Sequence, residues 1–268
     1  MRSAALVAFI ALVAALSLPL SGMSGAALAQ RSTRPVPAPR VERVVPFKVG
    51  ETLSYDVSWT SFLVAGSAVV SVKEKKPSFN ATAYYIVAEG RPIALLARLY
   101  SLYYKMDTLI DSVTLLSQRG SLYAEEGKDR RTSITTFDRA MKLVFFEEDS
   151  DTTTKLDYAV PPDAQDGLSA LYALRTRTFT PGEHVTVAVA DSGSLYRLQA
   201  TVGVPEQVRV PFGEATAWPI KGFIADSAGQ LAWDNIAFWI TNDARRLPLK
   251  MQADLPVGAF VLALRDAQ

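Results

Sequence analysis

The sequence predicts a mainly β protein: a curved antiparallel sheet or an open barrel or sandwich, with one or two short helices. Two observations predict this class. Apolar and polar residues alternate with a period of two in many short runs. Turn-forming residues separate these runs at intervals of about 8 to 12 positions, which is typical of antiparallel all-β folds.

Residues 1–29 have the three parts of a secretory signal peptide. Arg2 gives a positive start, residues 4–18 are apolar and uncharged, and Ala27-Leu28-Ala29 is a small-residue cleavage site. The apolar run is about 15 residues, shorter than the ~20 that a transmembrane helix needs. We therefore expect cleavage after Ala29, export to the periplasm, and no transmembrane segment in the remaining chain.

Residues 30–45 form a Pro/Arg-rich linker with three prolines, four arginines and no apolar period. Such a composition favours an extended spacer. Attraction of the arginines to anionic lipid or cell wall is the alternative, but short charged tracts are commonly only solvated.

The β-rich domain, residues 46–268, opens with a clear strand after the Gly50-Glu51 turn. Its apolar residues alternate with polar ones and are Leu53, Tyr55, Val57 and Trp59. This pattern indicates a strand with one buried face. Similar runs recur to the end of the chain, for example HVTVAVAD and LAWDNIAFWIT.

Two segments break the alternation and predict helices. In residues 92–105, PIALLARLYSLYYK, leucines and tyrosines recur at three- and four-residue spacing. In residues 163–176, DAQDGLSALYALRT, the same spacing recurs, and Asp163 or Asp166 can cap the first turn through its carboxylate.

Matching features at a constant offset suggest two similar β halves, residues 46–150 and 177–268, joined by the helix near 163–176. The pairs Gly50 and Gly182, Asp111 and Asp243, and Leu115 and Leu247 are each 132 residues apart. Chance likeness is the alternative, because turns reuse Gly and Asp widely.

Several blocks resemble the domain-of-unknown-function family 3108 (DUF3108) of bacterial exported proteins. They include PFKVGETLSYDVSW at the start and FWITNDARRLPLKMQADLPVGAFVLAL at the end, and the likeness covers about residues 46–266. Residues 92–104 depart from the family by being unusually apolar. The resemblance implies a fold and an exported location, and it brings no settled activity and no catalytic residues.

Composition excludes several classes of function. Removal of residues 1–29 takes away Arg2 alone, leaving 27 basic and 27 acidic residues. A neutral chain argues against nucleic acid as a partner, since phosphate binding needs a basic excess. The absence of cysteine excludes disulfides, thiolate metal sites and an N-terminal lipid anchor on cysteine.

No catalytic, metal-binding or cofactor site is predicted. His184 is the single histidine, and with Asp191 and Ser192 it offers the only serine–histidine–acid set. We interpret DSGS, residues 191–194, as a hairpin turn rather than part of a triad. Glu125 and Glu126 cannot act as a carboxylate pair unless a bulge turns one of them, because neighbouring strand residues face opposite sides.

The best functional clue is a surplus of apolar and aromatic residues in two regions. We predict ligand-binding residues there, namely Leu95, Leu96, Leu99, Tyr100 and Tyr103 in the first region and Trp218, Trp233 and Trp239 in the second. A helix laid across the concave face of a curved sheet would enclose an apolar cleft of the kind that binds ligands. Packing of these residues into an ordinary core is the competing interpretation.

We therefore expect a non-enzymatic binder or carrier of an apolar envelope molecule, either a lipid or a polymer. An envelope assembly or scaffold protein that binds another protein is the alternative, and a hydrolase is the least favoured of the three. An enclosed cavity would favour the carrier, whereas a flat exposed apolar patch would favour the scaffold.

Overall fold

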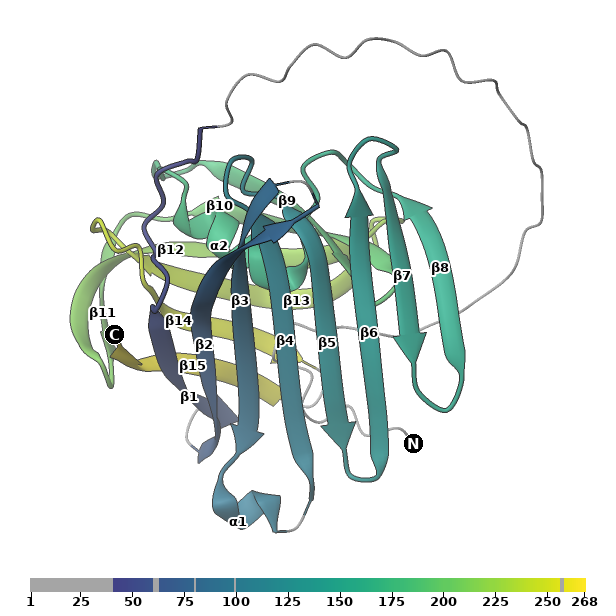
Figure 1. Cartoon of the computed structure of the whole chain (residues 1–268). Coiled ribbons are helices and arrows are strands. Elements are labelled where there is room, and N and C mark those ends of the chain that lie inside the picture. The colour runs from purple at the N-terminus through teal and green to yellow at the C-terminus, as the bar shows by residue number, and fades with distance from the viewer. Residues whose placement is uncertain (1–40, 60–62, 80, 99, 256–257) are drawn as a thin grey trace, which may run out of the picture.

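The computed structural model describes residues 41–268 except 60–62, 80, 99 and 256–257. The predicted signal peptide and most of the linker lie outside the described residues, so cleavage after Ala29 stays a prediction. The described chain is mainly β, in one antiparallel sheet that is not closed into a barrel, with two helices (Figure 1). This agrees with the fold class that the sequence predicts.

Eight strands precede the longer helix. They are β1 (Thr52–Trp59), β2 (Leu63–Ser78), β3 (Ala81–Pro92), β4 (Leu102–Asp111), β5 (Ser117–Glu126), β6 (Asp129–Asp138), β7 (Leu143–Asp149) and β8 (Thr153–Ala159). Seven strands follow it, namely β9 (His184–Asp191), β10 (Ser194–Val202), β11 (Glu206–Val210), β12 (Gly213–Asp226), β13 (Leu231–Thr241), β14 (Pro248–Leu255) and β15 (Gly258–Ala267).

The first and last strands meet in the middle of the sheet. β1 pairs with β15, and the strands then follow in order outward on each side to β8 and to β9, while β11 pairs with β12. At one end of this central pair Trp59 lies opposite Phe260, and at the other Leu53 lies opposite Ala267. The sheet therefore has two separate edges, β8 and β9, joined by the chain that contains the longer helix.

That helix, α2 (Gly167–Arg175), lies against the concave face of the sheet (Figure 1). Asp166 caps it: its carboxylate accepts hydrogen bonds from the N–H groups of Leu168 and Ser169, and the Ser169 hydroxyl accepts one from the N–H of Asp166. The helix predicted near 163–176 is therefore present, and of the two proposed capping residues Asp166 is the cap.

The first predicted helix is much shorter than its pattern indicates. Only α1 (Ala94–Ala97) is helical, and Leu102 and Tyr103 already belong to β4. β4 pairs along its length with both β3 and β5. Two ladders of hydrogen bonds thus override the helical spacing of the leucines and tyrosines, as tertiary pairing commonly does. No helix in the described ranges is long and apolar enough to cross a membrane.

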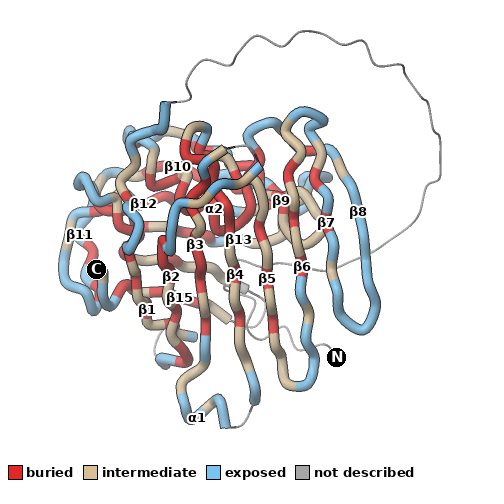
Figure 2. The backbone as a smooth tube through the Cα atoms, viewed as in Figure 1, coloured by how far each residue is buried: buried red, intermediate tan, exposed pale blue. Residues whose placement is uncertain are grey.

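The core is built around α2. One side of the helix, with Leu168, Leu171 and Tyr172, packs into a cluster with β1–β5 and β13–β15. The other side, with Ala170 and Leu174, packs against β9, β10, β12 and β13. Figure 2 shows buried positions gathered around α2, whereas the β7–β8 hairpin is largely exposed.

A buried ion pair ties the end of α2 to the start of β1. Arg175, with a fully buried side chain, donates to both carboxylate oxygens of Glu51 at 2.6 and 2.8 Å. It also donates to the carbonyl oxygens of Arg245 and Arg246 in the β13–β14 loop. Although burial opposes the charge, the bonds to Glu51 keep the pKa of Arg175 above its ordinary value.

Two pairs of strands begin 132 residues apart, the same offset as the matching features in the sequence. β1 begins at Thr52 and β9 at His184, and β3 begins at Ala81 while β12 begins at Gly213. The N–H of Gly50 donates to the carbonyl of Val72, and that of Gly182 donates to the carbonyl of Val202. Duplication of residues 46–150 and 177–268 stays a prediction, which these correspondences favour.

Candidate ligand-binding cavity

An apolar cavity of about 120 Å³ lies between α2 and the inner face of β9–β15. The helix contributes Gly167, Ala170, Leu171 and Leu174 to its wall. The sheet contributes apolar side chains from β9, β10 and β12–β15. Gly167 lies one helical turn before Leu171, and Ala170 lies one turn before Leu174. These four residues therefore form a single stripe along α2, which makes one wall of the cavity.

Two aromatic rings form the opposite wall. Trp233 at the start of β13 stacks on Tyr196 of β10, with ring centroids 6.2 Å apart and an interplanar angle of 22°. Both residues line the cavity. Burial raises the pKa of the Tyr196 hydroxyl, which therefore stays neutral well above pH 7. Among the predicted ligand-binding residues that the structure describes, Trp233 is thus the one that lines this cavity.

Polar groups are few and lie on the sheet side. Asp191 and Gln252 contribute to the lining, and the Asp191 carboxylate accepts a hydrogen bond from the Ser192 hydroxyl at 3.2 Å. Asp191 and Gly167 also border a much smaller space of about 10 Å³, lined in addition by Ser133 and Thr135 of β6. The apolar cavity therefore has a small, more polar neighbour, which lies between β4–β6, the start of α2 and Asp191 at the end of β9.

Hydrogen bonds of the Asp166 side chain attach the start of α2 to the inner face of the sheet. Its second carboxylate oxygen accepts from the hydroxyls of Thr108 on β4 and Ser117 on β5. Gly120 makes this approach feasible, because a Cβ there would come within 3.0 Å of the Asp166 Cβ. The helix is thus fixed to the first half of the sheet, and the cavity remains on the side of the second half.

The other two predicted tryptophans lie elsewhere. Trp218 packs on Phe179 with centroids 6.2 Å apart, and its indole N–H donates to the Asn242 side chain. Trp239 is buried on the outer face, where its N–H donates to Glu206 and Lys250 lies 4.6 Å above its ring. These contacts account for both rings without a ligand.

The first predicted region lies at the tip of the β3–β4 connection. Leu95 and Tyr100 are exposed, Leu96 and Tyr103 are half-buried, and Leu99 lies outside the described residues. Figure 1 places α1 beyond the ends of β3 and β4, away from α2. The structure therefore does not bring this region together with Trp233.

Several cavity residues escaped prediction. Tyr196, Ile224 and Phe260 come from strands far apart in sequence, and each occupies an ordinary inward position of an alternating strand. Ala170 and Leu174 could have been found, because they lie on the apolar face of the predicted helix. What the sequence lacks is the pairing order that brings β10 and β13 beneath α2.

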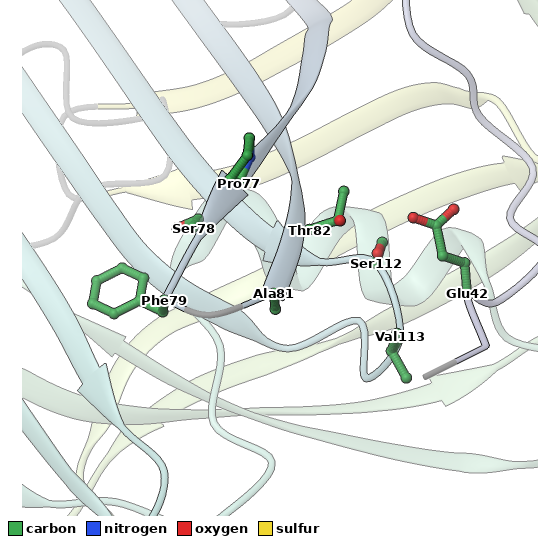
Figure 3. A pocket seen from close by; sticks show the side chains of 8 residues that line it. All are labelled: Glu42, Pro77, Ser78, Phe79, Ala81, Thr82, Ser112 and Val113. Carbon is green, nitrogen blue, oxygen red and sulfur yellow. The ribbon is translucent and has the colours of Figure 1, made fainter. Parts of the chain in front are cut away.

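A larger opening of about 570 Å³ lies between the β2–β3 turn and the β4–β5 turn. Its side chains do not converge: Phe79 points away from Glu42 (Figure 3). Glu42 is paired with Lys75 at 2.5 Å, and this hydrogen bond holds the pKa of Glu42 below its usual range. We regard this opening as a surface groove without a matched set of ligand-binding groups.

The residues considered for catalysis are separated. His184 begins β9 and bonds to the Thr201 hydroxyl, whereas Ser192 follows the other end of that strand in the turn to β10. Glu125 and Glu126 have different partners, Ser101 and Tyr104. Across the described residues no three His, Asp or Glu side chains gather as a metal site would need.

The architecture is that of an open, barrel-like β-sheet protein with an internal helix. It is similar to a beta-barrel-like protein of domain-of-unknown-function family DUF1849 from Brucella abortus, with 12% identity, coverage of 84% of this chain and 98% of that chain, and a TM-score of 0.54. A Bacteroides fragilis protein with a YmcC-like fold is 11% identical over 85% of this chain and 100% of that chain, with a TM-score of 0.37.

Residues 54–265 match the family described as protein of unknown function DUF3108, so the chain belongs to DUF3108. This confirms the resemblance in the opening and closing blocks of the sequence. None of the curated proteins matches this chain.

Proposed function

We propose that this protein binds the apolar part of an envelope lipid or polymer in the cavity between α2 and the β9–β15 half of the sheet. The observation that carries the proposal is an apolar space walled by the stacked rings of Trp233 and Tyr196 and by a stripe of α2. Apolar concavities with few polar groups are the usual sites for small ligands.

The volume limits what the cavity holds. An apolar protein cavity of about 150 Å³ accommodates benzene, so 120 Å³ accommodates one ring or the end of an alkyl chain. Burial of about five methylene groups contributes ~4 kcal/mol, which alone corresponds to a millimolar dissociation constant. The rest of the ligand then lies outside the cavity, and tighter binding requires contacts there or movement of α2.

We also propose that the protein acts in the periplasm. Support comes from the signal-peptide pattern of residues 1–29. A carrier in an aqueous compartment must shield an apolar chain from water, because exposing it costs ~0.8 kcal/mol for each methylene group. An internal apolar cavity supports that role.

Filling the cavity tests the proposal. Ala253 on β14 lines it, and Ala253→Phe would place a ring inside. Dodecanoate is the probe, titrated to millimolar concentration and followed by native mass spectrometry and tryptophan fluorescence. We expect uptake by the unmodified protein and at least a tenfold loss in Ala253→Phe.

Ala263→Phe is the matched control, because Ala263 is similarly half-buried but lies one strand away on the outer face, opposite Asp56. It should bind dodecanoate as the unmodified protein does. Absence of uptake in the unmodified protein, or equal uptake in Ala253→Phe, would sink the carrier proposal.

The scaffold alternative draws support from a different feature, the free edge of the sheet at β8. The large exposed apolar side chains are scattered over turns, strands and α1, among them Phe79, Leu95, Met141 and Leu231. Scattered single residues of this kind do not make a docking patch. The carrier is therefore the function that the geometry supports better.

A further inference from the structure

The outer edge of the sheet at β8 is open. Within the described residues β8 pairs only with β7, in a continuous register from Leu143 opposite Ala159 to Asp149 opposite Thr153. Every residue of β8 except Tyr158 is exposed. In Figure 1 the strand borders the sheet, and in Figure 2 most of it has the colour of exposed residues. The free backbone groups of such an edge can pair with another strand.

The two edges of the sheet differ in this respect. At the β9 edge the segment before α2 covers part of the strand: the N–H of Gln165 donates to the carbonyl of Ala188, and the N–H of Ala190 donates to that of Gln165. β8 has no such cover among the described residues, and it contains neither a proline nor a bulge in its pairing with β7. Cover, proline and bulges are three of the devices that commonly prevent edge pairing. A charged side chain is another, and β8 carries Lys155.

The sequence of β8 is complementary to itself. Lys155 and Asp157 flank Leu156 and lie on the outer face of the sheet, opposite Glu147 and Phe145 of β7. Lys155 pairs with Glu147 at 2.9 Å. Asp157 lies beside the exposed Phe145 ring, and the described residues offer it no cationic partner.

We propose that β8 pairs antiparallel with β8 of a second copy of this chain, centred on Leu156. In this register Lys155 lies directly opposite the partner's Asp157, and Asp157 lies opposite the partner's Lys155. Opposite charges at directly facing positions stabilise an antiparallel pair. Each copy contributes the same strand, and the contacts that the first copy makes to the second are repeated by the second to the first. The interface therefore has two-fold symmetry and is complete with two copies.

The inferred dimer is weak and depends on concentration. An interface of one seven-residue strand from each copy is small compared with the roughly 1,200 Å² that stable complexes bury. We expect a monomer–dimer equilibrium in the micromolar to millimolar range. This inference rests on the edge alone and does not depend on ligand binding in the cavity.

Charge reversal tests the register. Sedimentation of the purified chain from 10 to 500 μM should show reversible dimerisation, about tenfold weaker in Asp157→Lys and in Lys155→Asp, because each places like charges opposite each other twice. An equimolar mixture of these two variants restores opposite charges at both positions. The mixture should therefore dimerise about as strongly as the unmodified chain, which neither a folding defect nor a different interface would produce.

A cysteine at the axis gives a second measurement. The chain contains no cysteine, and facing residues of antiparallel strands lie at Cα distances that a disulfide can bridge. Leu156→Cys should form a disulfide-linked dimer on mild oxidation, whereas Phe145→Cys on the neighbouring strand should stay mostly monomeric. The proposal would be overturned if the unmodified chain were a monomer at all concentrations. It would also be overturned if Asp157→Lys and Lys155→Asp dimerised as strongly as the unmodified chain.

Discussion

Two arginines at the end of α2 have different surroundings although they are only two residues apart. Arg175 lies inside the protein, bonded to Glu51 and flanked by the rings of Phe47 and Tyr172. Arg177 lies at the surface and pairs with Glu183. Glu51 and Glu183 occupy the same place in the two Gly-Glu turns, so a single position of the sequence pattern supports a buried pair in one half and an exposed pair in the other.

Loss of the buried arginine should therefore destabilise the protein strongly. Arg175→Ala leaves the Glu51 carboxylate buried without its partner, and breaking a buried pair in this way costs about 3–5 kcal/mol. Urea unfolding followed by circular dichroism measures the change. Arg177→Ala is the matched control and should leave the midpoint nearly unchanged, because its pair is exposed. Equal effects of the two substitutions would contradict the role assigned to burial.

Among the elements, α2 matters most for the cavity, and the Asp166 carboxylate fixes its position. The same side chain caps the helix and accepts from hydroxyls on β4 and β5. Capping and docking therefore depend on one residue. Any change that removes it should loosen the helix and the cavity wall together.

Asp166→Ala tests this coupling. The lost cap costs about 1 kcal/mol, and the buried hydroxyls of Thr108 and Ser117 each lose a partner, at about 1–3 kcal/mol. We expect a loss of at least ~2 kcal/mol in unfolding free energy and faster hydrogen exchange in α2. Asp163→Ala, an exposed residue of the same connection, should change neither quantity. Unchanged exchange in Asp166→Ala would show that other contacts hold the helix.

The strands and α2 could be predicted from the sequence because their patterns are local. The sequence could not predict which face of the sheet, inner or outer, each tryptophan side chain lies on. Trp233 and Trp239 are six residues apart on β13, which would place them on the same face of a regular strand. The register shifts between Asp234 and Ala237, and Asn235 has a φ of 53°, so Trp233 turns inward and Trp239 outward. A bulge of this kind has no reliable sequence signal.

At the scale of the whole molecule, the two halves share one core. β1 and β15 join them in the sheet, and α2 packs against both. A third apolar cluster links β6 and β7 with β9. Neither half has a complete core of its own, so the described chain should unfold as one unit.

Two probes can check this cooperativity. In Trp59→Phe the remaining three tryptophans all lie on β12 and β13, so fluorescence reports on the second half while circular dichroism reports on the whole sheet. We expect coincident unfolding curves in urea, as a two-state transition requires. Separate midpoints would mean that the halves unfold independently.

The central position of β1 and β15 also governs the order of folding. Thr52 and Gln268 exchange backbone hydrogen bonds at 3.2 and 3.0 Å. During synthesis β1 is made early, yet its partner on one side is made more than 200 residues later. Contacts between such distant segments slow folding. The sheet can therefore be completed only after residues 258–267 have left the ribosome, and until then the chain remains open to chaperones and to any machinery that moves unfolded polypeptides.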